Sequence, residues 1–462
     1  MQRFAFTFLA SFAISACGGV SIESPPEPAP VPGPPAPSPL PQAKSLVCPG
    51  APIDHADDVL FWHQAEAGVM FVRHDGSSLL AHAHSPETPG FNAEVAAGGD
   101  RIALAAYTAV SAPNSIELFD RRGSKLAERA FMGGIVTGLF VADDGRVVFS
   151  VQAGTSNEGF IWDGGEPKSL GSWIPIGPVR DGWVPARKSW ETNTTTAFVH
   201  ESGSTKVFHS GSDQVWRAGS RLARVDGPTR ELWLGSPSGT AHVPLGAFGA
   251  EDAEPPHVAQ ARDEGFVLIR RSEWLKADVL VVNVDDQSVR FVPPAEPGID
   301  DELSFYCNAG WPGYLASDGS VLTSRIEGGQ LRVWKRAADG EHPLGLPLAS
   351  IAVLGLVERA GTTAILGSDG SDTYCGTPGE IWQSPAPKGA IVGDSLQFVR
   401  NPAEPRLGEF SSSFNEPSID ESGHCVLASS YDSGAWTARL QDIDSGAVFS
   451  LPSGTGIANF IR

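Results

Sequence analysis

One short motif recurs along the chain and constrains the fold more than any other feature. An apolar or aromatic strand is followed by a polar turn that contains glycine, and then by a second strand. Turns such as Asp-Gly and Ser-Gly supply the positive φ angles that a β-hairpin needs, so each copy predicts a hairpin. The strand segments of the motif are Val69–Val72, Ile116–Phe119, Phe160–Trp162, Ala197–Val199, Leu232–Leu234, Val279–Val282, Val333–Trp334, Ile381–Trp382 and Ala438–Leu440.

The spacing of these hairpins indicates the architecture. Their aromatic residues are separated by 48, 43, 36, 35, 101 and 48 positions, and the longest interval spans two units. A period in the forties is typical of four-stranded blades. We therefore predict an all-β fold, a β-propeller of about eight blades within a range of seven to nine. The two intervals near 35 suggest that one hairpin lies inside a neighbouring blade.

The last repeat adds a family resemblance. Residues Pro417–Ser429 lead into Ser430–Gly434, and Asp442–Gly446 follows. This segment resembles the repeat of TolB-type propellers, in which a Pro-x-x-x-x-x-Gly turn opens a strand and an Asp-x-x-x-Gly turn closes the blade. The resemblance implies a propeller fold. Because TolB-like propellers bind envelope proteins, it also implies an envelope protein as a possible partner.

The first residues predict export and lipid attachment. Arg3 precedes the apolar run Phe4–Ala13, which is too short to span a bilayer as a helix. Ile14–Cys17 resembles the bacterial lipobox, which implies a signal peptide at residues 1–16 and a lipid on Cys17. Ordinary signal cleavage near Cys17 is the alternative. Gly18, rather than Asp, implies the outer membrane by the same resemblance; the periplasmic and the surface face both stay open.

A proline-rich linker follows the lipobox. Residues 17–45 include ten prolines between 25 and 41, and proline cannot donate to a helix or a sheet ladder. An extended polyproline segment rises about 3.1 Å per residue, so this stretch reaches roughly 50 Å. We expect a spacer that holds the domain at residues 46–462 away from the membrane.

Charge and cysteine usage limit the partners and cofactors. The chain has 54 acidic and 33 basic residues, a net charge of -21, which disfavours nucleic acid. Apart from Cys17, four cysteines remain, which predicts two disulfides in an exported protein. We favour Cys48–Cys425 and Cys307–Cys375, with the other two pairings open. No two cysteines have the spacing of a zinc site, so neither a metal nor a cofactor is predicted.

Aromatic and histidine side chains supply the candidate ligand contacts. Trp173, Trp183 and Trp190 break the blade period and lie among glycines and prolines, so they are candidates for stacking a ligand. His82 and His84 alternate and would face one way on a strand, as a metal pair does, but no third ligand is identifiable. We interpret them as exposed loop histidines.

No catalytic residue is assigned. Gly393–Leu396 spells the GDSL of a serine esterase family, but no Asp-x-x-His follows, which favours a turn. Asp442–Gly446 resembles the start of a calcium loop, but Ser453 stands where an EF-hand needs a bidentate acid. The favoured function is therefore a lipid-anchored binding or scaffold propeller of the cell envelope. The alternative is an enzyme acting on glycans or peptides, with acids from several blades meeting in the funnel.

Overall fold

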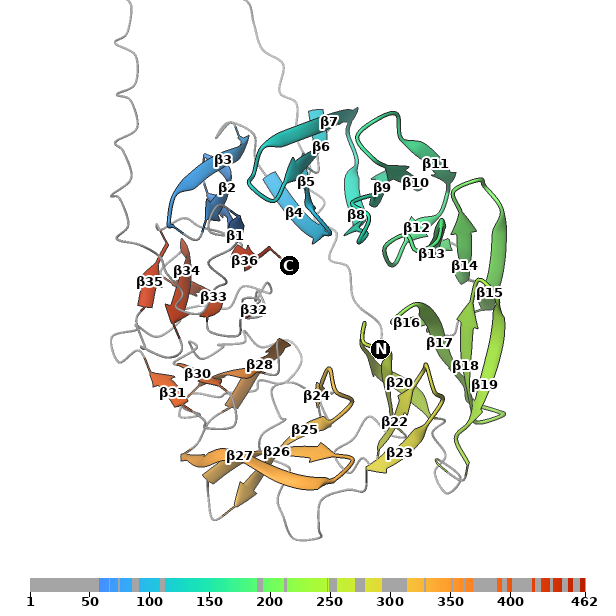
Figure 1. The fold of residues 1–462 in the computed structure, drawn as a ribbon, viewed down its shortest axis with the longest axis vertical. Helices are drawn as coiled ribbons and strands as arrows, with labels where there is room; N and C mark the ends of the chain where they lie inside the picture. Colours follow the sequence, from blue (N-terminus) through green and yellow to red (C-terminus); the bar gives the residue numbers. More distant parts are fainter. Residues whose placement is uncertain are drawn as a thin grey trace, which may run out of the picture. The chain divides into compact units, whose positions relative to one another are not determined.

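The protein is all-β in a computed structural model (Figure 1). The structure describes residues 58–65, 67–73, 75–84, 91–108, 113–188, 194–211, 214–246, 248, 256–270, 279–292, 314–327, 330–349, 352–359, 362–368, 389–392, 397–400, 418–419, 425–432, 435–442, 448–451 and 458–461. Among these residues there is no helix long and apolar enough to cross a membrane.

The described strands form nine four-stranded antiparallel sheets, which we number along the chain. Sheets 1–3 contain β1 (Val59–Ala65), β2 (Gly68–Arg73), β3 (Ser78–Ala83) and β36 (Ala458–Phe460); β4 (Phe91–Gly98), β5 (Arg101–Thr108), β6 (Pro113–Asp120) and β7 (Lys125–Met132); and β8 (Ile135–Val141), β9 (Val147–Ala153), β10 (Ser156–Trp162) and β11 (Lys168–Gly171). Sheets 4–6 contain β12 (Ile174–Pro175), β13 (Trp183–Lys188), β14 (Thr194–His200) and β15 (Thr205–Gly211); β16 (Trp216–Ala218), β17 (Arg221–Asp226), β18 (Glu231–Ser236) and β19 (Gly239–Pro244); and β20 (His257–Ala261), β21 (Phe266–Arg270), β22 (Val279–Asn283) and β23 (Val289–Val292). Sheets 7–9 contain β24 (Tyr314–Leu315), β25 (Val321–Glu327), β26 (Gln330–Ala337) and β27 (Gly340–Ala349); β28 (Ala352–Arg359), β29 (Thr362–Ser368), β30 (Gly389–Val392) and β31 (Gln397–Arg400); and β32 (Ser418–Ile419), β33 (Cys425–Asp432), β34 (Ala435–Asp442) and β35 (Val448–Ser450).

The sheets follow one another in chain order around a ring, which confirms the predicted propeller (Figure 1). Each of the eight hairpin motifs that fall on described residues begins on the third strand of a separate sheet. The described sheets number nine, which lies within the predicted range of seven to nine. No hairpin among them lies inside a neighbouring blade. The short intervals arise because only residues 172–173 separate β11 from β12 and only 212–215 separate β15 from β16.

Burial on both sides explains the composition of the inner strands. Ile102–Ala106 on β5 are five consecutive buried residues. Ile102 and Leu104 pack towards sheet 1, whereas Ala103 and Ala105 pack towards sheet 3. A strand between two packed layers cannot show the simple alternation of a half-exposed sheet, and it reads as a continuous apolar run.

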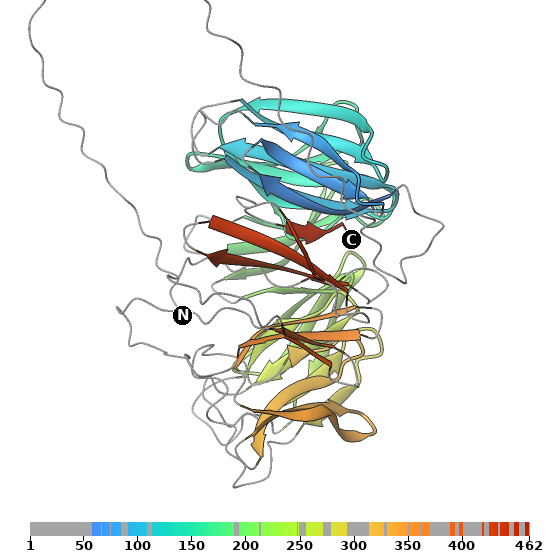
Figure 2. The ribbon, with the colours of Figure 1, turned by 90° about the vertical axis from the view of Figure 1, so that its left-hand side faces the viewer.

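The ring is closed because β36, from the C-terminal end of the domain, completes the sheet formed by β1, β2 and β3. β36 pairs with β1, with Phe61 opposite Phe460, and the two rings pack edge to face at 6.3 Å. Leu427 and Leu440 of sheet 9 belong to the same apolar cluster. Sheets 1 and 9 accordingly lie side by side in Figure 1 and in Figure 2. The predicted Cys48–Cys425 bond, which we placed near this seam, lies outside the described side chains.

The two ends of the sheets carry different kinds of connection. At one end, here called the turn face, the innermost strand joins the second and the third joins the fourth; the longest connection there is 176–182. At the opposite end, the loop face, the second strand joins the third and each sheet joins the next. The longer connections all leave from the loop face: 245–256, 271–278, 293–313, 369–388 and 401–417. Most of their residues lie outside the described part of the chain.

Candidate functional site at the interface between sheets 3 and 4

Basic side chains link consecutive sheets across the turn face. At each of the six interfaces from sheet 1 to sheet 7, an arginine or lysine reaches the next sheet. The pairs are Arg73 with the Arg122 carbonyl, Arg101 with the Asp163 carbonyl, Arg146 with Glu201, Lys206 with the Pro237 carbonyl, Arg217 with Asp263, and Arg290 with the Arg336 carbonyl. These contacts give the polar residues of the turn face a structural role.

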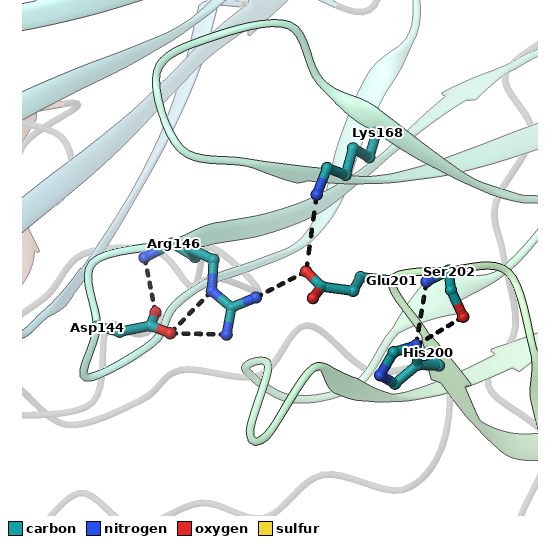
Figure 3. Close-up of polar contacts among 6 residues, drawn as sticks. All are labelled: Asp144, Arg146, Lys168, His200, Glu201 and Ser202. Atoms are coloured by element: carbon teal, nitrogen blue, oxygen red, sulfur yellow. Dashed lines mark hydrogen bonds and ion pairs between the residues drawn. The ribbon is translucent and has the colours of Figure 1, made fainter.

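The network between sheets 3 and 4 shows this arrangement in detail (Figure 3). Arg146 donates to Asp144 Oδ2 through Nε at 2.8 Å, and its Nη1 donates to Glu201 Oε2 at 2.9 Å. Lys168 Nζ lies 3.9 Å from the same Glu201 oxygen. The hydrogen bond from Arg146 holds the pKa of Asp144 below its usual range, despite some desolvation. The charged groups of this end therefore neutralise one another.

A serine–histidine pair in this network is a turn cap rather than an activated nucleophile. Ser202 Oγ lies 2.8 Å from His200 Nδ1, and the Ser202 backbone N–H donates to the same nitrogen. Asp144 and Asp318 bond in the same way to the backbone N–H two residues ahead. His200 thus occupies the place that Asp or Asn takes in such turns, and its ring packs against Trp183 at 4.8 Å.

The loop-face end of the same interface is built around Trp173. This residue lies between β11 and β12, and its carbonyl rests on Gly159 of β10, where a Cβ would come within 2.1 Å of the oxygen. Only glycine permits that approach. The Trp173 ring is 8% exposed, and the Lys188 ammonium lies 4.7 Å from its centroid. Lys188 makes no ion pair with any residue that the structure describes.

Asn157 stands out at this end because its amide is unsatisfied. It lies on the same side of β10 as Gly159, which is the side that faces sheet 4. Both polar atoms of the amide are buried, and neither has a hydrogen-bond partner among the described residues. Such a group costs about 1–3 kcal/mol when nothing pairs with it. Thr195 and Ser210, which are hydrogen-bonded at 3.2 Å, face it from sheet 4.

The structure separates the tryptophans that the sequence analysis grouped. Trp173 lies at the loop-face end of sheet 4, whereas Trp183 begins β13 at the turn face and lies 4.8 Å from Lys206 Nζ. The two ends of β13 are roughly 17 Å apart at the usual strand rise. Trp190 lies outside the described residues. Trp173 and Trp183 therefore lie near opposite ends of sheet 4.

The interpretation of His82 as an exposed loop histidine is wrong. His82 lies on β3, and its Nδ1 is 2.5 Å from Oε1 of Glu117, which is 2% exposed. Burial opposes ionisation of Glu117, but hydrogen bonds from His82 and Lys125 outweigh it and lower its pKa. His84 follows the strand, and its N–H donates to the Ala67 carbonyl. No group of three metal-binding side chains occurs in the described ranges.

The remaining candidate residues lie beyond what the structure describes. Cys17, Cys48, Cys307 and Cys375 fall outside it, as does the side chain of Cys425, so neither lipidation nor either disulfide is tested. Sequence reasoning missed Asn157, because an asparagine becomes notable only when its surroundings leave it unpaired. The six basic contacts of the turn face were missed for the same reason.

The comparisons with known proteins concern the fold alone. No family model matches the chain, and no curated protein matches it. Among solved structures, AztD from Citrobacter koseri is 8% identical, with 87% of this chain and 97% of that chain covered and a TM-score of 0.41. TolB from Acinetobacter baumannii is 11% identical, with 80% of this chain and 81% of that chain covered and a TM-score of 0.26.

An acylaminoacyl peptidase bound to a chloromethyl ketone is 10% identical, with a TM-score of 0.35. The match covers 77% of this chain and 58% of the peptidase, so the chain spans little more than half of that protein's length. The class of protein follows from the sheets themselves: a closed ring of four-stranded antiparallel sheets is a β-propeller.

Proposed function

We propose that this protein is a lipid-anchored propeller of the cell envelope that serves as a binding scaffold. The observation that carries the proposal is the division of its connections between two faces. Side chains link the sheets across the turn face, whereas the long connections leave from the loop face. Loops held by a rigid scaffold are the usual carriers of binding function. An envelope protein is the partner that we favour, with the loop face as its contact surface.

The lipobox supports the location. Cys17 follows the apolar run at the position where a lipoprotein signal peptide is cut, and the proline-rich linker would hold the propeller off the membrane. We propose outer-membrane attachment through lipid on Cys17, on either its periplasmic or its surface face. The acidic net charge supports a partner other than nucleic acid.

The anchor is tested by palmitate labelling in cells. Wild-type protein should carry the label and sediment with membranes, whereas Cys17→Ala should lose both. Label that persists in this variant would refute the anchor.

The binding face is tested with a photo-activated cross-linker at Thr155, an exposed residue of the loop face, and at Arg122, an exposed residue of the turn face. We expect an envelope protein to be captured from Thr155 and not from Arg122. Equal capture from both positions would contradict the proposal. Consumption of a glycan or peptide by the purified domain would replace it with the enzymatic alternative.

A further inference from the structure

The outer strand of sheet 6 presents an apolar edge to solvent. β23 is the outermost strand of its sheet and lies on the outside of the ring (Figure 1). Its Val289 and Phe291 side chains are 43% and 53% exposed, and both lie on the side of the sheet that faces sheet 5. No other strand carries two exposed large apolar side chains among the residues that the structure describes. Exposed apolar side chains that lie together are typical of a contact surface.

The main-chain groups of the same two residues point outwards. The Asn283 N–H donates to the carbonyl of Ser288, which lies opposite it, at 3.0 Å, so this pair is hydrogen-bonded. Hydrogen-bonded and non-bonded pairs alternate along antiparallel strands. Val289 and Phe291 therefore belong to non-bonded pairs, and their N–H and C=O groups point away from β22. No described residue bonds to these groups.

The other outer strands of sheets 1–7 have features that discourage pairing with a further strand. A β-bulge interrupts the pairing of β3, β7, β11, β15 and β27 with the neighbouring strand of the same sheet. β19 is regular, but Pro244 ends it, and its exposed Thr240 and His242 are polar. β23 has neither a bulge nor a proline. Proteins protect sheet edges by such features, so the unprotected edge of β23 indicates a strand that pairs with another strand.

We propose that β23 pairs with β23 of a second copy of this chain. The two strands run antiparallel across a two-fold axis, so the contact joins two four-stranded sheets into one continuous sheet. A two-fold contact uses the same surface on both copies and must be complementary to itself. This contact lies on the rim of the ring and is separate from the loop-face binding surface proposed above.

One register alone lets both outward-pointing residues form hydrogen bonds. Centring the pair on Arg290 places Val289 opposite the partner's Phe291 and Phe291 opposite the partner's Val289. Centring it on Val289 would place Phe291 opposite Gln287, which lies in a turn with φ +60°. Centring it on Phe291 would place Val289 opposite Pro293, which has no N–H. The Arg290 register also opposes an aromatic with a β-branched side chain, which is a favourable cross-strand pair.

Charge opposes this contact and makes it depend on salt. Arg290 would lie opposite the partner's Arg290, but its guanidinium donates to the Arg336 carbonyl at 3.2 Å and to the Gly319 carbonyl, which holds it towards sheet 7. Each chain also has a net charge of -21, so two copies repel each other. Salt screens this repulsion beyond about 8 Å at physiological ionic strength. Because the contact is small, we expect a weak dimer that tightens as the salt concentration rises.

Sedimentation equilibrium of the full-length chain tests the contact, from micromolar to submillimolar protein and at low and high salt. Every sample carries Cys17→Ala, so that no lipid contributes to association. Phe291→Lys places a charge on the edge of β23. Thr240→Lys is the matched control, because it adds the same charge at an exposed position of β19, the outer strand of the neighbouring sheet.

The reference protein should form a dimer whose fraction rises with protein concentration and with salt. Phe291→Lys should weaken the dimer about tenfold or more, because a charge on an edge strand blocks pairing. Thr240→Lys should associate like the reference. The Tm of dilute Phe291→Lys should equal that of the reference, since the Phe291 side chain is 53% exposed in the monomer.

Disulfide formation between single variants checks the register. Val289→Cys mixed with Phe291→Cys should cross-link faster than either variant alone, because only the mixture places two of the new thiols in opposed positions. The cross-linked dimer is measured on a non-reducing gel.

Several outcomes would overturn the proposal. They are a monomer at every concentration and salt level, undiminished association of Phe291→Lys, and an equal loss of association in Thr240→Lys. Faster cross-linking by either cysteine variant alone would rule out the pairing of the two β23 strands in this register. A lowered Tm of dilute Phe291→Lys would assign the edge to another segment of the same chain and exclude the second copy.

Discussion

The interface between sheets 3 and 4 is built differently at its two ends. At the turn face, Arg146 and Lys168 lie against Asp144 and Glu201, so charge is matched within the protein. At the loop face, the same two sheets leave the buried amide of Asn157 without a hydrogen-bond partner among the described residues, and the Lys188 ammonium lies over the Trp173 ring. One end joins the two blades through paired charges, whereas the other leaves a buried amide without a described partner.

The difference follows from how the chain is connected. Short turns at one face hold their polar side chains close to the neighbouring sheet, where a basic residue can reach a carbonyl or carboxylate of the next turn. At the other face, the chain passes between strands and between sheets through connections of very different length. Uniform turns favour a repeated contact, whereas variable connections favour local, specific surroundings.

The largest expected effect concerns the disulfides, which would extend this contrast between faces. In the sequence, Cys307 lies between β23 and β24 and Cys375 lies between β29 and β30, whereas Cys425 begins β33. We expect Cys307–Cys375 and Cys48–Cys425. Reducing the second bond should lower the free energy of unfolding by about 4–5 kcal/mol, because it closes nearly the whole domain into one loop.

Peptide mapping without reduction checks the pairing, and urea unfolding with and without reductant checks the stability. A Cys48–Cys307 or Cys48–Cys375 peptide, or four free thiols, would rule this arrangement out.

The second prediction breaks the loop-face end alone. Gly159→Ala places a methyl group against the Trp173 carbonyl and should cost about 3 kcal/mol, because backbone atoms must move. The control is Gly154→Ala, in a loop-face turn with φ +62° and nothing within 4 Å of the added methyl. That variant should cost about 1 kcal/mol from backbone strain. Equal losses in thermal unfolding would show that Trp173 does not depend on Gly159.

The third prediction concerns sheet 1. It tests how acid destabilises the ring away from the interface between sheets 3 and 4. His63 on β1 is 5% exposed, and burial lowers its pKa to about 4. His63 therefore binds a proton near pH 6.5 in the unfolded chain but stays neutral in the folded chain. As a result, the free energy of unfolding falls as the pH drops from 6.5 towards 4. The loss should reach about 2 kcal/mol at pH 5 relative to pH 8.

His63→Leu should remove that part of the pH dependence in urea unfolding. His242→Gln is the control, since its side chain is 44% exposed. An unchanged slope in His63→Leu would mean that another group titrates.

The smallest expected effect concerns the turn-face joint. Arg146→Met removes the links to Asp144 and Glu201 and should cost about 1 kcal/mol, because both carboxylates stay partly hydrated. Arg129→Met is the matched control; its pair with Glu166 is more exposed and should contribute less. The hydrogen bond from Arg146 lowers the pKa of Asp144 in the folded protein, so the difference between wild type and Arg146→Met should shrink as the pH falls below the usual range of an aspartate and through that lowered pKa. Equal stability of the two variants would show that the contacts of Arg146 do not stabilise the joint between sheets 3 and 4.

Most of the fold could be predicted from the sequence, because it depends on local chemistry. Strand, turn and period are short-range properties, so hairpins such as those at Phe160–Trp162 and Leu232–Leu234 were predicted where they occur. The number of sheets was harder to predict, because the interval between repeats also includes the connections between strands. The short connections after β11 and β15 reduce that interval to a length that suggests a missing strand.

The sequence by itself determined the repeat, the all-β class and the acidic charge, because each depends on residues close together or on composition. Only the tertiary structure decided which polar groups meet. Arg146 and Glu201 are joined across two sheets, Trp173 and Trp183 are separated by one strand, and Asn157 is left without a described partner. Such pairings depend on the packing of neighbouring sheets, which no local pattern encodes.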